Sequence, residues 1–396
     1  MQKRVLFLGG AYAQVPIIQE AKDRGWYIIT CDYLPGNPGH KLADEYYNVS
    51  TTDFQGVLEL AKKVNPDFVI AYASDPAAPT AAYVSDKLGL PGNTYNSVKL
   101  LSEKDLFRKF LKDNGFNTPN AISVDRDLQL TDLERLEYPQ IVKPTDSSGS
   151  KGVTRVENNG DIEAAISYAL NFSRNKRVII EEFIESHGCQ LHGDGFVENG
   201  ELVFLHLGEH HYNININPFV PYSTTWPNTR LDNEIELVKK ELSKAIMLSG
   251  FKNGAVNIEV RTKDSGDIYI MEIGPRSGGN FVPQVINYCT GYNMVEAILK
   301  NLNGEVVKPQ IPLNNNPSAY YVIHSSKDGE LEFLNINEEL KPFINEFHQY
   351  IPLGANVRSF QGANAAIGIL LLTFTSVKEM KYYITNMEDF VQIIIK

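Results

Sequence analysis

The first hundred residues alternate between apolar stretches typical of buried strands and amphipathic stretches typical of helices. The strand patterns lie in RVLFLGG, WYIITCDY and PDFVIAYAS, and the helix patterns in VPIIQEAKDRG, FQGVLELAKKV and APTAAYVSDKLG. Strands that alternate with helices form parallel, doubly wound sheets, because each helix carries the chain back across the sheet. We therefore expect an N-terminal α/β domain with ligands at the carboxyl ends of its strands. The turn LGGAYA lacks the spacing of a dinucleotide-binding glycine motif.

Beyond residue 97 the pattern changes to helices mixed with antiparallel strands. Residues 98–115 predict an amphipathic helix or a pair of helices that ends at Gly115. From 191 to 275 strand patterns dominate, and Asn199-Gly200 is typical of a hairpin turn. We therefore expect a chain of mixed α/β and α+β class with three domains, namely 1–97, 98–305 and a C-terminal α+β unit over 306–396.

The composition argues against some classes of partner. A formal net charge of −11 and a pI near 5.3 disfavour general binding to nucleic acid or to an anionic membrane, since either needs a basic face. The cysteines fit neither a zinc spacing nor a disulfide framework, which favours a reducing cytoplasm. The longest apolar stretch, AAIGILLLTF at 365–374, is about half of what a membrane-spanning helix requires. We expect a soluble, cytoplasmic protein without nucleic-acid or membrane partners.

Five short segments together carry the residue types that hold ATP with magnesium. In chain order they are Lys104 in SEKDLFR, Lys143 followed by TDSSGSKG, the strand VIIEEFI at 178–184, Glu259 in VNIEVR and Glu272 in MEIGPRSGG. Lysines neutralise phosphate charge, backbone N–H groups of a Gly/Ser loop wrap phosphates, and carboxylates hold the metal. A single lysine is more often a solvated surface charge, so the ordered combination carries the specificity.

A predicted hairpin brings two of these residues together. VNIEVRT and DIYIMEIG flank the turn KDSG, so we expect Thr262 opposite Asp267. Continuing this register puts Glu259 opposite Ile270, and Glu259 and Glu272 then lie diagonally on one face of the sheet. Two carboxylates this close repel unless a cation or a proton lies between them. The alternative is a solvated hairpin with incidental acids, but GPRSGG directly after Glu272 favours a metal site.

The ordered set resembles the ATP-grasp superfamily, over residues 1–305. Its members mostly join a carboxylate to an amine through an acyl phosphate. The resemblance implies an N-terminal pre-ATP-grasp domain, a central ATP-grasp fold and a C-terminal unit that serves as a lid or for dimerisation, so a homodimer is one expectation. It also implies ATP and one or two Mg²⁺ ions as cofactors, and a small-molecule carboxylate and amine as substrates.

The resemblance implies roles for the nucleotide-binding residues. Lys104 and Lys143 bind the phosphates. Adenine lies against the strand end from Glu182 to Ile184, with Glu181 near its exocyclic amine, and Gln190 takes the place of the ribose ligand. The loop that closes over the γ-phosphate contributes Ser147, Ser148, Gly149, Ser150 and Gly152.

The metal and catalytic residues follow in the last segments. The resemblance implies Glu259 and Glu272 as magnesium ligands and Glu272 and Arg276 as catalytic residues, with Arg276 stabilising the transferring phosphoryl group. The superfamily usually shows Glu-x-Asn-x-Arg here, with Asn as a third ligand, whereas MEIGPR puts Gly274 in that position. A second magnesium must therefore lose a ligand, take water, or borrow a neighbouring asparagine, Asn257 or Asn280.

The segment HLGEHHYN contains His206, His210 and His211 and invites a metal assignment. Adjacent histidines on a strand point to opposite faces, so at most two of the three converge, and zinc is not favoured. We expect instead that His210 or His211, with a loop at 218–228, lines the carboxylate pocket. Further candidates for that pocket are Arg230, Ser277 and Asn280.

These patterns together predict an ATP- and Mg²⁺-dependent ligase that forms an amide bond and releases ADP. One alternative of the same fold is a bicarbonate-activating enzyme, similar to carbamoyl-phosphate synthase or to a biotin-dependent carboxylase. The chain is short for a complete synthase and has no Met-Lys-Met run typical of biotin attachment. The other alternative is a non-catalytic ATP-binding regulatory module, which Gly274 favours and which Glu259, Glu272 and Arg276 disfavour.

Overall fold

The structure is a computed structural model that describes residues 2–124, 135–307 and 314–396. Its N-terminal region forms the parallel sheet that the alternating pattern predicts. The strands β1 (Arg4–Leu8), β2 (Tyr27–Cys31), β3 (Glu45–Tyr47) and β4 (Phe68–Ile70) lie in the order β3-β2-β1-β4. β3 is an edge strand that is too short to show a pattern in the sequence.

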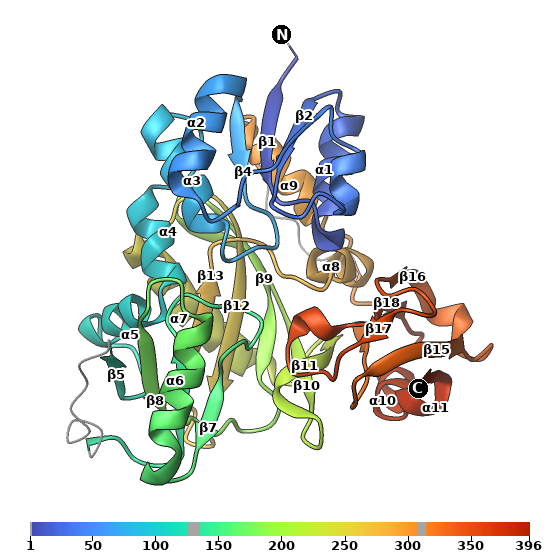
Figure 1. The fold of residues 1–396 in the computed structure, drawn as a ribbon. Helices are drawn as coiled ribbons and strands as arrows, with labels where there is room; N and C mark the ends of the chain where they lie inside the picture. The colour runs from blue at the N-terminus through green and yellow to red at the C-terminus, as the bar shows by residue number, and fades with distance from the viewer. Residues whose placement is uncertain (1, 125–134, 308–313) are drawn as a thin grey trace.

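Helices cover both faces of this sheet (Figure 1). Helices α2 (Phe54–Val64) and α3 (Ala78–Leu88) pack on one face, against Leu6 and Leu8 of β1. Helix α1 (Val15–Asp23) packs on the other face, against Val5 and Phe7. Beside α1 lies α9 (Met294–Leu302), which belongs to a much later part of the chain. The N-terminal sheet therefore shares a hydrophobic core with the end of the central region.

A pair of helices and a small antiparallel sheet follow. Helices α4 (Tyr95–Ser102) and α5 (Lys104–Asp113) are separated by Glu103, whose backbone is extended at φ −91° and ψ 115°. The small sheet has the order β5-β8-β6-β7 and packs against α6 (Ile162–Phe172). Its strands are β5 (Ala121–Val124), β6 (Gln140–Pro144), β7 (Thr154–Val156) and β8 (Val178–Glu182).

A large antiparallel sheet forms the centre of the molecule, in the order β13-β12-β9-β10-β11-β14-β18-β16. Helix α7 (Asp232–Ser249) packs with hydrophobic residues of β12 and β13, and α8 (Val282–Thr290) packs with those of β11, β14 and β18. The strands are β9 (Leu191–Glu198), β10 (Glu201–Asn213), β11 (Asn217–Trp226), β12 (Gly254–Thr262), β13 (Ile268–Gly274), β14 (Ser318–Ile323), β16 (Ile344–Gln349) and β18 (Gly368–Thr373).

The C-terminal region continues this sheet. Strand β14 pairs with β11, so the sheet crosses the boundary predicted at residue 306, and the domain limits remain a prediction. The region also forms a smaller sheet in the order β17-β15-β19, with α10 and α11 beside it. The bounds are β15 (Gly329–Ile336), β17 (Asn356–Val357), β19 (Val391–Ile395), α10 (Val377–Thr385) and α11 (Met387–Phe390). In the described residues, no helix is both long and apolar enough to cross a membrane.

Two local predictions have opposite outcomes. Asn199 and Gly200 have φ values of 53° and 89° and join β9 to β10, which confirms the predicted hairpin turn. The loop expected at 218–228 is wrong, because most of that segment is strand β11. Its β-branched and aromatic side chains suit a strand, and Pro221 lies at an irregularity in the pairing with β10, the kind of place where a sheet tolerates proline.

Candidate active site

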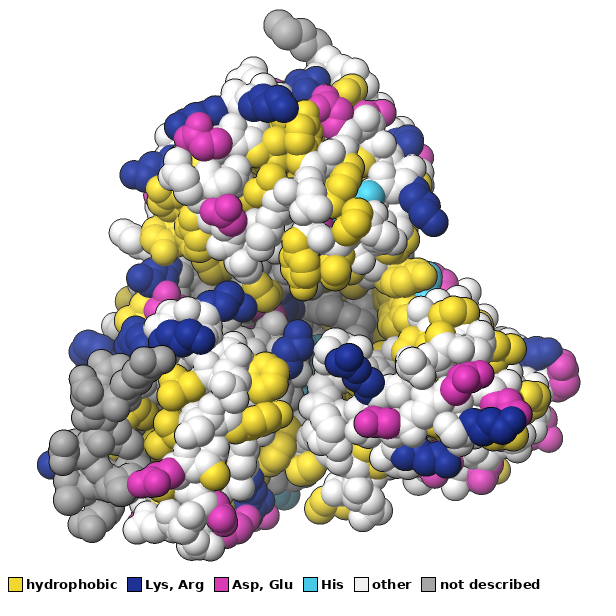
Figure 2. Space-filling model, in the orientation of Figure 1, with side chains coloured by type: hydrophobic (Ala, Val, Ile, Leu, Met, Phe, Trp, Pro, Cys, Tyr) yellow, Lys and Arg dark blue, Asp and Glu magenta, His cyan; other side chains and the backbone are white. Residues whose placement is uncertain are grey.

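The predicted site residues surround a cavity of about 360 Å³. The cavity lies between the small sheet with its Gly/Ser loop and the large sheet, and the molecule is hollowed where these parts meet the N-terminal region (Figure 2). Predicted residues that line it are Lys104, Lys143, Ser147, Ser148, Gly149, Ser150, Glu181, Glu182, Ile184, Gln190, His210, Glu259, Glu272, Arg276 and Asn280.

The glutamate hairpin has a register different from the predicted one. Thr262 pairs with Ile268 instead of Asp267, and a bulge between Glu259 and Val260 shifts the ladder once more. Glu259 therefore lies directly opposite Glu272 instead of diagonally from it. A bulge adds one residue to one strand, which the turn sequence does not reveal. The two carboxylates lie on the same face of the sheet, as predicted, but they are directly opposed instead of diagonal.

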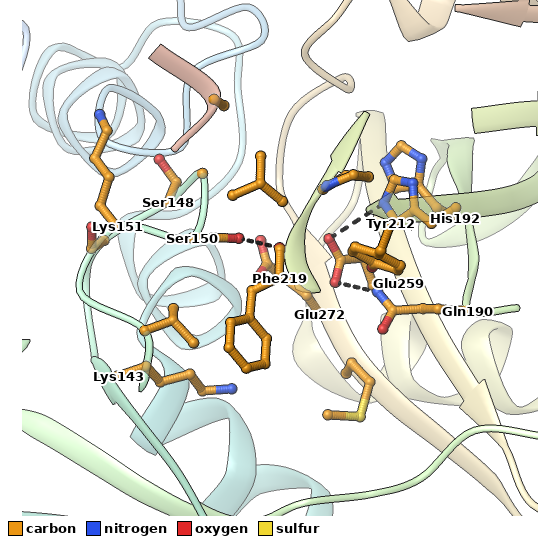
Figure 3. Close-up of a pocket in the computed structure, with 18 of the residues that line it drawn as sticks. Lys143, Ser148, Ser150, Lys151, Gln190, His192, Tyr212, Phe219, Glu259 and Glu272 are labelled. Carbon is orange, nitrogen blue, oxygen red and sulfur yellow. Dashed lines mark hydrogen bonds and ion pairs between the residues drawn. The ribbon is translucent and has the colours of Figure 1, made fainter. Parts of the chain in front are cut away.

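Glu259 is held by polar neighbours inside the cavity (Figure 3). Gln190 Nε2 donates to Glu259 Oε2 at 2.8 Å, and His210 Nε2 lies 3.9 Å from Oε1. Burial, together with the charge of Glu272, raises the pKa of Glu259 to about 7. A carboxylate pair of this kind attracts a cation, because a cation removes the repulsion that raises this pKa.

Gln190 links the metal-ligand candidate to the strand end expected to hold adenine. Its Oε1 accepts a hydrogen bond from Arg261 Nε at 2.7 Å, and Arg261 Nη1 donates to the carbonyl of Ile184 at 2.6 Å. Both ends of the Gln190 amide are thus engaged by protein groups. A ribose hydroxyl could meet Gln190 only by sharing or replacing one of these contacts.

Lys143 and Glu181 form a buried ion pair beside the cavity. Lys143 Nζ lies 2.6 Å from Glu181 Oε2, and Arg108 Nε donates to Glu181 Oε1 at 2.8 Å. Burial raises the pKa of Glu181, but Arg108 and Lys143 outweigh it and the pKa falls to about 2. Burial lowers the pKa of Lys143 to about 8, against the opposite influence of Glu181. Glu181 therefore holds Lys143, and its carboxylate is not free for the adenine amine.

The sequence did not point to Arg108, although it supports the site from behind. It lies on α5, and it donates to the carbonyls of Ile270 at 3.4 Å and Met271 at 2.9 Å. These carbonyls belong to the bulged part of β13 directly before Glu272. A basic residue on an amphipathic helix gives no local signal that it will be buried.

The Gly/Ser loop is folded over the cavity. Ser150 Oγ donates to the carbonyl of Phe219 on β11 at 2.6 Å, which ties the loop to the large sheet (Figure 3). Gly149 and Ser150 have φ values of 65° and 57°, a left-handed conformation that suits a tight turn. Lys104 Nζ donates to the carbonyl of Ser147 at 2.7 Å and lies 4.0 Å from Glu272. A cation thus bridges the loop and the carboxylate hairpin.

Arg276 is paired with Asp75, a residue that the sequence did not single out. Asp75 lies between β4 and α3 of the N-terminal region, and both residues line the cavity. Arg276 Nε donates to Asp75 Oδ1 at 2.6 Å and Nη2 to Oδ2 at 2.5 Å. Arg276 Nη1 donates to the carbonyl of Ser277 at 2.8 Å. Nothing in SDPAAPT predicts a partner so far away in sequence.

A buried polar cluster on β9, β10 and β12 adjoins Glu259. His192 stacks on His210 with ring centroids 4.0 Å apart, and Asn257 Nδ2 donates to Asp194 Oδ1 at 2.8 Å. Asp194 also accepts the backbone N–H of Gly278. Burial lowers the pKa of His192 to about 3, so that ring is neutral near pH 7. The Asn257 amide hydrogen-bonds to His192 and Asp194 in this cluster, whereas Asn280 lines the cavity.

Some predicted residues do not line the cavity. His211 bonds to Thr225 on the opposite face of β10, as the alternation of strand side chains requires. Arg230 donates to the carbonyls of His187 and Cys189, and Ser277 is buried and lines a separate, smaller cavity. Gly152 packs against Pro144 and Phe172 at the foot of the loop. Packing between distant segments turns the side chains of His211, Arg230 and Ser277 away from the cavity, and the roles assigned to these residues and to Gly152 stay predictions.

No cluster of three or more His, Cys, Asp or Glu side chains suited to a metal occurs within the described ranges.

Comparisons with known proteins find a family, relatives and solved structures to which this chain is similar. A family model described as an ATP-grasp domain matches residues 136–284. Residues 136–284 are an ATP-grasp domain. The match spans β6 to the start of α8, and so includes the Gly/Ser loop and both hairpin glutamates.

Curated relatives share parts of the chain around this ATP-grasp domain. The formate-dependent phosphoribosylglycinamide formyltransferase of Prochlorococcus marinus is 27% identical over 188 residues, which are 46% of this chain and 48% of that protein. The carbamoyl phosphate synthase large chain of Thermotoga petrophila is 27% identical over 283 residues, which are 67% of this chain and 24% of that protein. The chain thus spans less than half the length of these relatives.

Solved structures resemble the whole chain. The L-amino acid ligase from Bacillus licheniformis has a TM-score of 0.84 and 22% identity, covering 100% of this chain and 99% of that one. The biotin carboxylase domain of Hydrogenobacter thermophilus 2-oxoglutarate carboxylase, solved with MgADP and bicarbonate, has a TM-score of 0.78 and 16% identity, covering 100% and 92%. These likenesses confirm the predicted fold class around the ATP-grasp domain.

Proposed function

We propose that this protein is an ATP- and Mg²⁺-dependent ligase that activates a carboxylate as an acyl phosphate and joins it to an amine. The observation that carries the proposal is the directly opposed pair of Glu259 and Glu272, in a cavity that Lys104, Lys143 and Arg276 also line. This arrangement matches the charges of MgATP, because the carboxylates suit the metal and the cations suit the phosphates. Similarity to a domain solved with MgADP supports the choice of ligand.

In the proposed complex Lys104 and Lys143 hold the phosphates while the loop at 146–152 closes over the γ-phosphate. Adenine lies against the strand end at Glu182 to Ile184. Glu259 and Glu272 would hold Mg²⁺, which would supply positive charge that neutralises the phosphates. A second ion would draw on Asn280 or water, because Asn257 already has protein partners.

The proposed reaction has two displacements. An oxygen of the substrate carboxylate attacks the γ-phosphorus, and the bond from that phosphorus to the departing ADP oxygen breaks. The amine nitrogen then attacks the acyl carbon and loses a proton, and phosphate departs with the former carboxylate oxygen. Arg276 and the lysines orient and neutralise the phosphoryl oxygens in both steps, so the protein contributes position and charge.

Similarity to a carbamoyl phosphate synthase large chain favours a second candidate, in which bicarbonate replaces the organic acid. The site geometry is compatible with both, because bicarbonate presents the same nucleophilic oxygen. The substrate requirement separates the two candidates.

ADP release at fixed MgATP, measured over amino acids, small organic acids and amines, tests the proposal. A ligase should release ADP in response to an organic acid, a bicarbonate enzyme in response to bicarbonate alone, and an ATP-binding module to neither. With an ¹⁸O-labelled acid, the label should appear in inorganic phosphate. Unlabelled phosphate from an acid-dependent reaction would rule out the acyl phosphate.

Glu272→Gln tests the metal site. We expect ADP release to fall at least about tenfold, because a magnesium ligand is lost. Without Mg²⁺ the variant should melt at a higher temperature than the wild type, because the repulsion with Glu259 is removed. Glu201→Gln, on the exposed start of β10, is the matched control and should change neither quantity. A Glu272→Gln protein that retains its activity would contradict the assignment.

A further inference from the structure

The pairing of Arg276 with Asp75 joins two regions that are far apart in sequence. The side chain of Arg276 is 8% exposed and that of Asp75 is 24% exposed, so the pair is mostly shielded from solvent. Both carboxylate oxygens of Asp75 accept from the guanidinium, which fixes the plane as well as the position of Arg276. Ala73, just before Asp75, has a φ of 52°, a strained value for alanine. The turn after β4 is thus held in a costly conformation that presents Asp75.

Gly274 leaves space beside the pair of Asp75 and Arg276. Its backbone lies outside the left-handed region, so its conformation does not require glycine. A Cβ at this position would lie 3.0 Å from Asp75 Oδ1 and 3.4 Å from Arg276 Cζ. The absence of a side chain at position 274 therefore leaves the room that the carboxylate of Asp75 occupies.

The pair leaves Arg276 able to bind an anion. A guanidinium has five N–H donors, of which Asp75 takes one on Nε and one on Nη2, and the Ser277 carbonyl takes one on Nη1. Within the described residues, one donor on each terminal nitrogen then has no acceptor. Two donors on the terminal nitrogens can bind a phosphate or a carboxylate bidentately.

We propose that Asp75 is a positioning residue: it orients Arg276 toward the phosphoryl group, and Gly274 is required because Asp75 fills the space beside it. The N-terminal region then completes the phosphoryl site of the ATP-grasp domain. This inference rests on the proposed function for the identity of the anion. The geometric coupling between positions 75 and 274 does not depend on it.

A double-mutant cycle on melting temperature tests the coupling without any ligand. Gly274→Ala should lower the melting temperature by at least about 2 °C, because its Cβ crowds Asp75. In the Asp75→Ala background the same change should cost nothing. Gly279→Ala is the matched control, since a Cβ there meets no atom within 4 Å. Equal losses from Gly274→Ala in both backgrounds would overturn the proposed complementarity.

Binding of MgADP with orthovanadate, a mimic of the transferring phosphoryl group, tests the positioning role. Asp75→Ala should weaken the affinity of the MgADP complex for vanadate about tenfold, because Arg276 loses the partner that orients it. The affinity for MgADP without vanadate should not change. Asp75→Asn keeps one acceptor and should lie between Asp75→Ala and the wild type. Adding Gly274→Ala to Asp75→Ala should cause no further loss.

The outcomes separate this inference from the proposed function. Wild-type protein that binds neither MgADP nor vanadate would contradict the proposed function, while the melting cycle would still decide the coupling. Wild-type binding that Asp75→Ala and Asp75→Asn leave unchanged would overturn the positioning role. An equal loss of MgADP and vanadate binding in a well-folded Asp75→Ala protein would also overturn it, because orientation of Arg276 should act on the phosphoryl group alone.

Discussion

At the scale of single residues, the charges of the site are arranged before any ligand binds. Lys143 is held by Glu181, and Arg276 by Asp75. Glu259 is hydrogen-bonded by Gln190. Groups held in this way lose little freedom when a nucleotide arrives, so more of the binding energy remains for stabilising charge in the transition state.

The protonation of Lys143 should make nucleotide binding depend on pH. Its pKa is lowered by burial to about 8 in the ligand-free protein, and a bound phosphate favours the charged form and raises that pKa again. Binding above about pH 8 should therefore take up a proton, and MgADP affinity should fall as the pH rises further. Isothermal titration at about pH 8.5, in buffers of different ionisation enthalpy, measures this uptake.

Lys143→Arg is the control for this prediction, because arginine keeps its charge over the same range. The variant should bind MgADP without proton uptake. If it shows the same uptake as the wild type, another group is responsible for the pH dependence.

At the scale of elements, close contact between strands of the large sheet shapes the wall of the cavity. A Cβ on Gly193 of β9 would lie 2.0 Å from the carbonyl oxygen of His206 on β10. A Cβ on Gly208 of β10 would lie 2.3 Å from the carbonyl oxygen of Thr225 on β11. Both glycines therefore allow neighbouring backbones to approach, which keeps His192 and His210 stacked beside Glu259.

Gly193→Ala should disturb this arrangement. The new methyl group would meet backbone atoms that cannot rotate away, so β9 must move from β10 at a cost of roughly 1–3 kcal/mol. We expect a lower melting temperature and weaker MgADP binding than in Gly36→Ala, which adds the same methyl group in open space at an exposed position away from the cavity. Calorimetry and titration of the two variants side by side measure both effects. Identical behaviour would show that the strands can separate freely.

At the scale of the whole molecule, the cavity is built from all three parts of the chain. The N-terminal region supplies Asp75, the central region supplies the lysines and the glutamates, and the C-terminal region supplies Tyr320, Val322 and Phe360. Tyr320 also accepts a hydrogen bond from Thr224 of β11 at 2.8 Å. The C-terminal region is therefore part of the site as well as of the sheet.

Removal of residues 306–396 should abolish folding of the central region. A chain that ends at residue 305 would leave the edge of β11 unpaired and would expose Trp226, which is fully buried in the intact chain. We expect aggregation in size-exclusion chromatography and loss of the near-UV circular dichroism signal. A monomeric 1–305 fragment that binds MgADP would show that the C-terminal region is dispensable.

The sequence alone determined those features of the fold that depend on the local pattern of residues. Alternating strand and helix patterns predicted the parallel N-terminal sheet, and Asn199-Gly200 predicted the β9–β10 hairpin of the large sheet, because backbone conformation follows from neighbouring residues. The ordered lysines, loop and glutamates predicted an ATP-grasp domain, and the family match over residues 136–284 includes Lys143, the loop and both glutamates.

Only the tertiary structure decided which side chains meet. The bulge that sets Glu259 opposite Glu272, the burial of Arg108 against Glu181, and the pairing of Asp75 with Arg276 all depend on packing between distant segments. Such contacts leave no periodic signal, since an aspartate in a turn looks the same whether it faces water or an arginine 201 residues away. The sequence therefore predicted most of the candidate residues that line this cavity, and the packing of three regions determined its geometry.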